Sequence, residues 1–469
     1  MFEGSLLHTM RDLRDGSLTA SELTAIAIDH HECRGAALDA YKTWAPERAM
    51  RDAETADRLF RAGIDLGPLQ GIPISVKDLF GVAGLPTFAG TARRLPRMWE
   101  AEGPLVARLR KQLGVVTGKT HTVELAFGGL GVNDHWGTPR NPWDATEHRV
   151  PGGSSAGAGV SLCEGSALLA LGTDTAGSVR IPAAMTGNVG LKITKGRWST
   201  NGIVPLSPTL DTPGMLARSV EDIAIAFAAL DPSDVPLERV LGEGRAMTPS
   251  ALRVGVIADS VWEACPTDVE HSVRDALREL SESGATLVDV HLPEAQEALE
   301  LLHSGSVVSA ECDEFVEAEL PEWRPLLGPV LKMRIDDGAR ISGREFLNRL
   351  RSLRRLASRG GRCFEDVGVD LLVLPTLPIT APTVREVSDH TAYRRINMVA
   401  LRNTCLANYL GLCAMTLPVG LDGGGLPIAL QVLAPAHSER YLIAAARAME
   451  RLLGTPAERI GVPSMFETT

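Results

Sequence analysis

The chain of 469 residues lacks the features that mark several classes of protein. Basic residues do not outnumber acidic ones: the net charge is -11, and the lysines and arginines are scattered, which argues against a nucleic-acid partner. No run approaches the roughly eighteen apolar residues of a membrane helix. The first residues also lack the basic start and apolar core of a secretory signal. We therefore expect a cytoplasmic protein with no membrane span and a small-molecule partner.

Cysteine and aromatic residues are both scarce. The seven cysteines are odd in number, dispersed and without a CxxC pair, which favours reduced thiols in the cytoplasm over a disulfide framework. Aromatic residues make up 4% of the chain, so a broad aromatic cage is not expected, although one or two rings suffice for an aryl substrate. The cluster "DHHEC" at 29–33 matches no standard metal spacing, and we interpret it as a polar helix face with no metal.

The residues that are present favour an α/β fold. Residues 5–62 read as helices, with Thr19 and Glu22 in a capping-box pattern. From residue 66 onward, short apolar runs bounded by Gly and Pro alternate with amphipathic stretches, which predicts a large, mixed, mostly buried β-sheet with helices on both faces. We expect one domain over 1–469, with a core at 66–230 and a helical layer or insertion at 294–365.

Several shorter segments can be interpreted as connections, strands or loops. Residues 231–250 look like a connection between elements. Four later apolar runs are predicted to be strands: 252–258, 285–293, 370–376 and 414–420. The run "GVVTGKT" at 114–120 resembles a phosphate-binding loop, but Leu113 stands where that motif needs its first glycine, so nucleotide binding is disfavoured. The run "PGGSSAGAG" at 151–159 lacks the order of a dinucleotide fingerprint.

The stretch "LALGTDTAGSVRIPA" at 169–183 places Ser178 on a turn of small residues that follows a probable buried strand. Serine needs a base to act as a nucleophile, and the stretch contains no histidine. Ser154 lies 24 residues earlier, separated by a predicted helix and strand that would bring the chain back beside its start. Lys77 ends the apolar run 72–76, where burial would lower its pKa and make it a base. The alternative is a solvated Lys77 paired with Asp78.

Three motifs carry a resemblance to a known family. "GIPISVKD", "PGGSSAGAG" and "GTDTAGSVRIPA" closely resemble the amidase signature family, and "GLKITKGRWSTNGIVPLSPTLDTPG" continues the likeness. It extends more weakly to "DLLVLPTLPITAP", "NYLGLCAMTLPVG" and "GLPIALQVLAP", and so covers most of the chain. The segments "NPWD" and "SPTLDTPG", with the C-terminal helix, look most like the bacterial branch that contains indoleacetamide and other aryl-amide hydrolases.

The resemblance implies a Ser-cisSer-Lys triad without metal or organic cofactor. Ser178 would be the nucleophile, Ser154 the bridging serine behind a cis peptide, and Lys77 the base. The backbone N–H groups of Thr175, Ala176, Gly177 and Ser178 would form the oxyanion hole. Ser155, Thr173, Asp174 and Arg180 would support the triad loops, and Asp174 and Arg180 could pair with each other.

The implied activity is hydrolysis of a small carboxylic amide, aryl or short acyl, through an acyl-enzyme. Esters, anilides and carbamates stay open as substrates, and a homodimer stays open as the assembly. The alternative is the catalytic subunit of a glutamine-dependent amidotransferase, which would share every catalytic residue. A non-catalytic relative is disfavoured because all three triad positions are intact. The hydrolase is favoured because the chain ends soon after its last predicted helix, which leaves no appended domain.

Two positions depart from the family pattern, and the substrate pocket is less defined. Ala176 replaces a glycine, which is tolerable if its φ is negative, and His121 stands where many members have Asn. For His121 we favour packing or substrate contact over a role as the base. From proximity to the motifs, we expect Phe127, Trp136, Leu210 and Met215 to line the acyl pocket.

Overall fold

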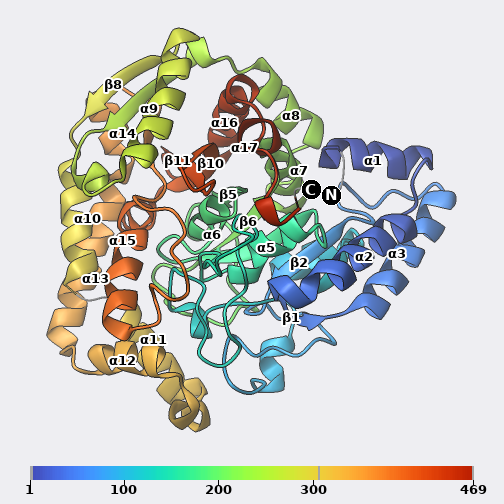
Figure 1. The fold of residues 1–469 in the computed structure, drawn as a ribbon, viewed down its shortest axis with the longest axis horizontal. Helices are drawn as coiled ribbons and strands as arrows, with labels where there is room; N and C mark the ends of the chain where they lie inside the picture. The colour runs from blue at the N-terminus through green and yellow to red at the C-terminus, as the bar shows by residue number, and fades with distance from the viewer. Residues whose placement is uncertain (1–3, 305–306, 467–469) are drawn as a thin grey trace.

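A single mixed sheet runs through the computed structural model, which describes residues 4–304 and 307–466 (Figure 1). In this part of the chain the sheet has 11 strands in the order β1-β3-β2-β4-β6-β5-β10-β11-β9-β7-β8. The strands are β1 Tyr41–Trp44, β2 Pro73–Lys77, β3 Val115–Thr120, β4 Leu169–Asp174, β5 Val189–Lys192, β6 Thr212–Ala217, β7 Arg253–Ile257, β8 Thr286–Val290, β9 Leu371–Pro375, β10 Cys413–Leu421 and β11 Pro427–Ala434.

Parallel and antiparallel pairs occupy different parts of this sheet. β2 pairs in parallel with both β3 and β4, and β7 pairs in parallel with β8 and β9. The strands between these two blocks, from β4 to β9, are joined by antiparallel pairs. Because β2 and β4 are parallel neighbours, their carboxyl ends lie at the same edge of the sheet, and the chain leaves both strands beside one another.

Helices cover both faces of the sheet, as predicted. Successive side chains of a strand point to opposite faces. On β4, Ala170 belongs to a buried cluster with α5 (Ala156–Glu164) and α6 (Arg180–Met185). Its neighbours Leu169 and Leu171 join the main core with α7 (Val220–Leu230). Both faces of the central strands are therefore buried, which explains their nearly continuous apolar sequences.

The N-terminal region is helical with one strand that the sequence did not predict. It contains α1 (Leu6–Asp15), α2 (Ala20–Leu38) and α3 (Pro46–Arg61), and the capping box of Thr19 and Glu22 is present at the start of α2. Between α2 and α3 lies β1, so the expectation of helices throughout 5–62 was wrong there. Four residues carry too little periodicity to reveal a strand, and β1 exists because it pairs with the edge of β3.

The remaining helices alternate with the strands. The four later strands predicted from apolar runs are β7, β8, β9 and β10. Residues 231–250 are not simply a connection, because they contain α8 (Leu237–Ala246), which packs against α16. The other helices of this part are α4 (Pro104–Lys111), α9 (Thr267–Glu282), α16 (Glu439–Leu453) and α17 (Pro456–Ile460).

The described residues of the segment 294–365 lie mostly in helices. This segment contains α10 (Pro293–His303), α11 (Val307–Glu319), α12 (Pro329–Ala339), α13 (Gly343–Gly360) and the start of α14 (Arg362–Val367). Together with α15 (His390–Tyr409), these helices form the left flank of the molecule in Figure 1. The division of the chain into one domain with an inserted helical layer stays a prediction.

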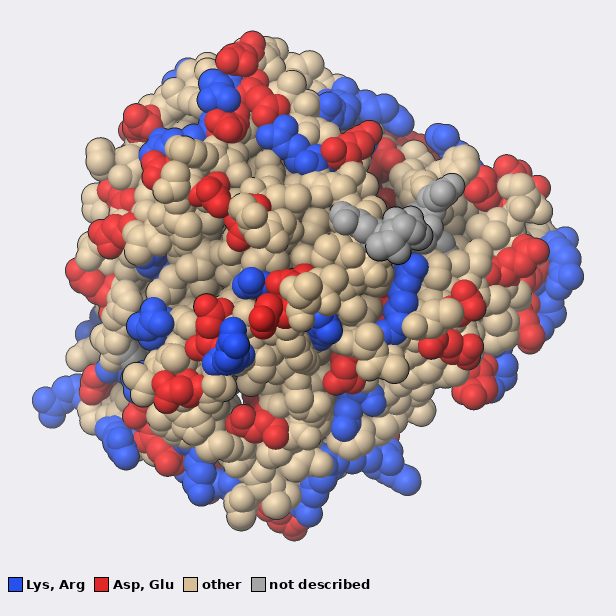
Figure 2. All heavy atoms as spheres, in the orientation of Figure 1, with Lys and Arg blue, Asp and Glu red and all other residues tan. Residues whose placement is uncertain are grey.

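The charged surface and the hydrophobicity of the helices bear on which partners the protein can have. Figure 2 shows acidic and basic side chains intermixed over the face in view, without a continuous basic patch there. None of the helices within the described ranges is long and apolar enough to cross a membrane.

Candidate active site

Lys77 is the last residue of β2, and its side chain is completely buried. Its Nζ donates hydrogen bonds to Ser154 Oγ at 2.7 Å and to Thr173 Oγ1 at 2.8 Å. Burial lowers the pKa of Lys77 to about 7, although the charges of Asp211 and Asp174 oppose the shift. A lysine in this setting changes between ammonium and free amine near neutral pH, as a general base requires.

The alternative pairing of Lys77 with Asp78 is wrong. Asp78 is buried and forms an ion pair of 2.9 Å with Lys119 instead. Lys119 belongs to "GVVTGKT", which the structure places in and just before the fully buried strand β3. A strand buried along its whole length offers no cradle for a phosphate, in agreement with the sequence argument against nucleotide binding.

Ser154 lies on the loop that leads into α5. The Gly153–Ser154 peptide bond is cis, as the resemblance implied. The Ser154 carbonyl accepts hydrogen bonds from the Val123 N–H and from Thr122 Oγ1, at 3.2 and 3.0 Å. The N–H of the next residue, Ser155, donates to the Ser178 carbonyl at 3.3 Å. The loops that carry the two serines are therefore joined directly through the backbone.

The turn after β4 carries Ser178 close to two constrained residues. The φ angle of Ala176 is not positive, so an alanine is tolerated at this family position, as expected. Gly177 has φ +135°, and a Cβ there would overlap the side chain of Thr404 on α15. Only glycine fits this position, and α15 thus packs tightly against the turn that carries Ser178.

Asp174 and Arg180 hold the two ends of this turn together. They form a fully buried bidentate ion pair, with Nε–Oδ2 and Nη2–Oδ1 distances of 3.0 and 2.9 Å. Burial alone would raise the pKa of Asp174, but the charge and hydrogen bonds of Arg180 outweigh burial and lower that pKa to about 2. The Asp174 carboxylate also accepts hydrogen bonds from the N–H groups of Gly177 and Val179.

Residues distant in sequence complete the shell around Arg180. Its guanidinium donates to the Thr404 carbonyl and to Asn408 Oδ1, both at 2.7 Å, and to Gln431. Sequence analysis missed these three partners because they lie more than 220 positions downstream, outside the strongest motifs. It also missed Asp211, which accepts a hydrogen bond of 2.6 Å from Thr175 Oγ1.

The predicted oxyanion hole needs one correction. The Gly177 N–H already donates to Asp174 Oδ1 at 2.8 Å, so it is not free for a substrate oxygen. The N–H groups of Thr175, Ala176 and Ser178 are left for that role. Within the described chain, no hydrogen bond joins Ser154 Oγ to Ser178 Oγ; such contacts often form only when substrate is bound.

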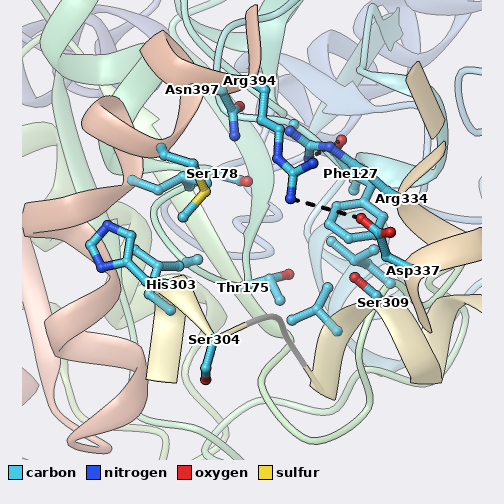
Figure 3. A pocket seen from close by; sticks show the side chains of 18 of the residues that line it. Phe127, Thr175, Ser178, His303, Ser304, Ser309, Arg334, Asp337, Arg394 and Asn397 are labelled. Carbon is cyan, nitrogen blue, oxygen red and sulfur yellow. Dashed lines mark hydrogen bonds and ion pairs between the residues drawn. The ribbon is translucent and has the colours of Figure 1, made fainter. Parts of the chain in front are cut away.

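A pocket of about 480 Å³ opens at Ser178. We call one group of its lining residues the catalytic wall: Ala126, Phe127, Gly128, Thr175, Ala176, Ser178 and Leu206. The other group, the helical wall, comes from α10 to α13, the residues just after them, and α15: Leu302, His303, Ser304, Val308, Ser309, Met333, Arg334, Asp337, Ile341, Arg349, Tyr393, Arg394, Asn397, Met398, Leu401 and Tyr409. Figure 3 shows Ser178 and Thr175 in the middle of the view, with His303 on one side and Phe127, Arg334 and Asp337 on the other.

Of the four predicted pocket residues, only Phe127 lines this pocket. Met215 is on β6, fully buried in the main core. Leu210 packs in the same core, and the nearby Leu206 reaches the pocket instead. The Trp136 indole donates to the Thr91 carbonyl and packs edge-on against Phe88. Proximity in sequence was misleading because neighbouring side chains on strands and turns point to different faces.

His121 behaves as a packing residue. It is 1% exposed, its ring meets Trp136 edge-on, and it does not line the pocket. Burial lowers the pKa of His121 to about 3, so the imidazole is neutral at pH 7. Neither a role as the triad's base nor substrate contact is supported for this histidine.

Metal binding finds no support either. Within residues 4–304 and 307–466, no group of three or more His, Cys, Asp and Glu side chains could hold an ion. "DHHEC" lies on α2, where His31 contacts Glu164 at 3.1 Å, as expected for a polar helix face. The seven cysteines are all free, which also agrees with the sequence analysis.

Comparison with known proteins identifies the family. The family model described as Amidase matches residues 22–443. The chain belongs to the amidase family. It is 48% identical to a 2-amino-5-chloromuconic acid deaminase from Comamonas testosteroni, over 98% of both chains. It is also 32% identical to a glutamyl-tRNA(Gln) amidotransferase subunit from Aromatoleum aromaticum, over 96% of this chain and 97% of the other.

Solved structures of this amidase family share the fold over nearly the whole chain. A crystal structure of an amidase superimposes with a TM-score of 0.84 at 30% identity, covering 96% of this chain and 100% of the other. The peptide amidase from Stenotrophomonas maltophilia gives a TM-score of 0.80 at 28% identity, covering 99% of each chain. The chain is therefore a hydrolase of amide C–N bonds with the mixed α/β fold of these enzymes.

Proposed function

We propose that this amidase uses Ser178 as nucleophile, Ser154 as proton relay and Lys77 as general base. The observation that carries the proposal is the hydrogen bond of 2.7 Å between Ser154 Oγ and a completely buried Lys77 amine. Because the pKa of Lys77 is about 7, a large share of the enzyme holds a free amine at neutral pH. The lone pair of that amine accepts the Ser154 proton, and Ser154 can then accept the proton of Ser178.

The first half of the reaction forms an acyl-enzyme. Ser178 Oγ attacks the substrate carbonyl carbon, and its proton passes through Ser154 to Lys77. The tetrahedral oxyanion is held by the N–H groups of Thr175, Ala176 and Ser178, which converge with little side-chain obstruction. The proton then returns through Ser154 to the leaving nitrogen, so that ammonia or an amine departs and the acyl group stays on Ser178.

The second half repeats the relay with water. Water gives its proton through Ser154 to Lys77 and attacks the acyl ester, and the Ser178 oxygen leaves with that proton. Thr173 and Ser155 act here as positioning residues: Thr173 accepts from Lys77, and Ser155 Oγ donates to the Thr173 carbonyl at 3.4 Å. The pair of Asp174 and Arg180 positions the turn of Ser178 in the same indirect way.

The second candidate function is that of an amidotransferase subunit. The greater identity to the deaminase, 48% against 32% to the amidotransferase relative, supports a free-standing hydrolase. The purified chain should release ammonia from a simple amide without any partner protein. If the chain by itself has no activity but gains glutaminase activity when the other amidotransferase subunits are added, the second candidate function is correct.

For the substrate, we propose a small molecule that fits a pocket of about 480 Å³. The sequence predicts aryl or short acyl amides, and the name of the Comamonas relative adds 2-amino-5-chloromuconic acid, whose nitrogen is carried by an unsaturated carbon rather than by an amide carbonyl, as a second kind of C–N substrate. A panel of aryl amides, short acyl amides, anilides, esters, carbamates and 2-aminomuconate, ranked by kcat/KM, tests the choice. An ester that forms an adduct of acyl mass on the Ser178 peptide would identify the nucleophile.

The compartment and assembly are also proposals. The seven free cysteines support the cytoplasm, where thiols stay reduced. A homodimer is a prediction that light scattering of the purified chain would test.

A further inference from the structure

Two buried side chains of the helical wall have polar atoms that form no hydrogen bond with any residue the structure describes. Tyr393 and Asn397 are 2% and 1% exposed, and both line the pocket. They are four residues apart on α15 and so share one face of the helix. Tyr393 Oη and Asn397 Nδ2 have no hydrogen-bond partner within the described ranges. Burying such groups unpaired is costly, which indicates that something outside the folded chain pairs with them.

The loop opposite α15 fixes how these groups face the pocket. The Gly129 N–H donates to Asn397 Oδ1 at 2.7 Å, so the amide is held with its NH2 group turned away from that loop. A Cβ on Gly128 would overlap the Tyr393 hydroxyl, so the loop approaches this ring as closely as glycine permits. Contacts with the loop therefore hold the Tyr393 hydroxyl and the Asn397 amide in place before any ligand binds.

Arg334 on α12 adds a charged donor to the same region. It donates to the Phe127 carbonyl at 2.8 Å, and its guanidinium lies over the Phe127 and Tyr393 rings at 4.9 and 5.6 Å from their centres. No ion pair of Arg334 occurs in the part of the chain that the structure describes. The other two pocket arginines do have carboxylates: Arg394 lies 3.9 Å from Asp337, and Arg349 contacts Glu345.

We propose that Arg334, Tyr393 and Asn397 form a carboxylate-binding subsite that anchors an acid group of the substrate while its C–N bond lies at Ser178. All three side chains supply donors here, and a guanidinium matches a carboxylate with two parallel N–H···O bonds. A neutral carbonyl would use fewer of these donors and leave the arginine charge without a counter-ion. The substrate assignment depends on the proposed function, but the carboxylate site itself does not.

The charge of the pocket supports an anionic ligand. Three arginines line it, and because Arg394 and Arg349 have the carboxylates named above, Arg334 leaves one positive charge without a carboxylate among the described residues, although the whole chain carries a net charge of -11. A local excess of positive charge in a hollow attracts small anions and raises their rate of association. The muconic acid in the name of the Comamonas relative is a six-carbon diacid, so a substrate of that kind could place one carboxylate in this subsite.

The test measures binding without turnover, in protein that carries Ser178→Ala. The probes are adipate, a flexible six-carbon diacid, and adipamide, its neutral diamide, titrated by calorimetry at low ionic strength. In the S178A background we expect adipate to bind at least about tenfold more tightly than adipamide, because hydrogen bonds to a charged group are the stronger ones. Equal affinity of the two probes would overturn the proposal and indicate that water pairs with these donors.

Three further variants in the same background locate the subsite. Tyr393→Phe removes a hydroxyl with no partner in the described chain, so Tm should not fall while the Kd of adipate rises several-fold. Arg334→Gln should raise that Kd by about tenfold or more. Arg395→Gln, an exposed residue of the same helix outside the pocket lining, is the matched control and should change the affinity for neither probe.

The outcomes separate this proposal from the proposed function. If Tyr393→Phe and Arg334→Gln both leave the affinity for adipate unchanged, the proposal of a carboxylate subsite is wrong. This conclusion would hold even if the wild-type enzyme hydrolyses amides. If Arg334→Gln does not fold, Tyr393→Phe still decides. The wild-type chain could also bind adipate in a way that depends on Arg334 and yet show no hydrolase activity. That result would support the carboxylate site and would contradict only the catalytic proposal.

Discussion

The catalytic wall and the helical wall of the pocket differ in how their polar groups are satisfied. Behind the catalytic wall, Asp174, Arg180 and Lys77 are buried and bonded to protein partners on several sides. On the helical wall, Tyr393 and Asn397 are buried with donors that have no partner in the described chain. In our proposals, the first arrangement fixes atoms for the reaction, and the second leaves donors for a ligand.

This difference follows from the elements that build each wall. The catalytic wall is built mainly from the segments that follow β3 and β4, two strands that both pair in parallel with β2, so its geometry is set by the core. The helical wall comes from α10 to α13 and from α15, which pack as an outer layer. We expect substitutions in the catalytic wall to affect the chemical step or the fold, and substitutions in the helical wall to affect substrate selection.

The largest effect is expected from Ser178→Ala. Loss of the nucleophile should lower kcat by several orders of magnitude, up to about a million-fold. The Tm should change little, because the substitution removes only one hydroxyl and keeps the backbone bonds of the turn. Ammonia release and labelling by a fluorophosphonate are the measurements, with the exposed Ser358→Ala as the matched control. Labelling that persists in S178A would place the nucleophile elsewhere.

Arg180→Met should damage the fold as well as the activity. Removing one partner of a buried ion pair leaves Asp174 as an uncompensated charge, which costs about 3–5 kcal/mol of unfolding free energy. The matched control is Arg14→Met, whose partner Asp65 is exposed, with an expected cost of about 0–1 kcal/mol. Urea unfolding of both variants measures the difference. Similar values for the two would mean that the buried pair does not hold the turn that carries Ser178.

The pH profile should report the titration of Lys77. The base must be the free amine, so kcat/KM should be constant above pH about 7 and fall about tenfold per unit below it. His303→Gln should keep this midpoint, because that pocket histidine has no place in the relay. Lys77→Arg should be inactive at every pH, since a guanidinium does not deprotonate in proteins. A midpoint that moves with His303 would assign the base to that histidine.

The smallest effect is expected on the helical wall. Met398→Ala enlarges the pocket without touching the triad, so KM for a well-fitting substrate should rise by about tenfold or less. The kcat for a small activated ester should stay close to that of the wild type. If Met398→Ala lowers kcat and leaves KM unchanged, the helical wall affects the chemical step and not only substrate selection.

The sequence could predict much of the catalytic wall because the relevant constraints are local. Three patterns are contiguous in the sequence: the buried strand that ends in Lys77, the helix and strand that return the chain from Ser154 to Ser178, and the small residues before Ser178. The family resemblance then supplied the cis peptide and the pairing of Asp174 with Arg180, and the structure contains both. The engagement of the Gly177 N–H by Asp174 was not predictable, since it depends on the shape of the turn.

The sequence by itself therefore determined the fold class, the family and the three residues proposed for catalysis. Only the tertiary structure decided which residues form the helical wall and which partner each buried charge has. Trp136, Leu210 and Met215 lie near the motifs along the chain, whereas Arg334 and Asn397 reach the site from distant helices. The physical reason is that a buried donor such as Tyr393 Oη, which has no partner among the described residues, can be recognised only when the positions of all its neighbours in space are known.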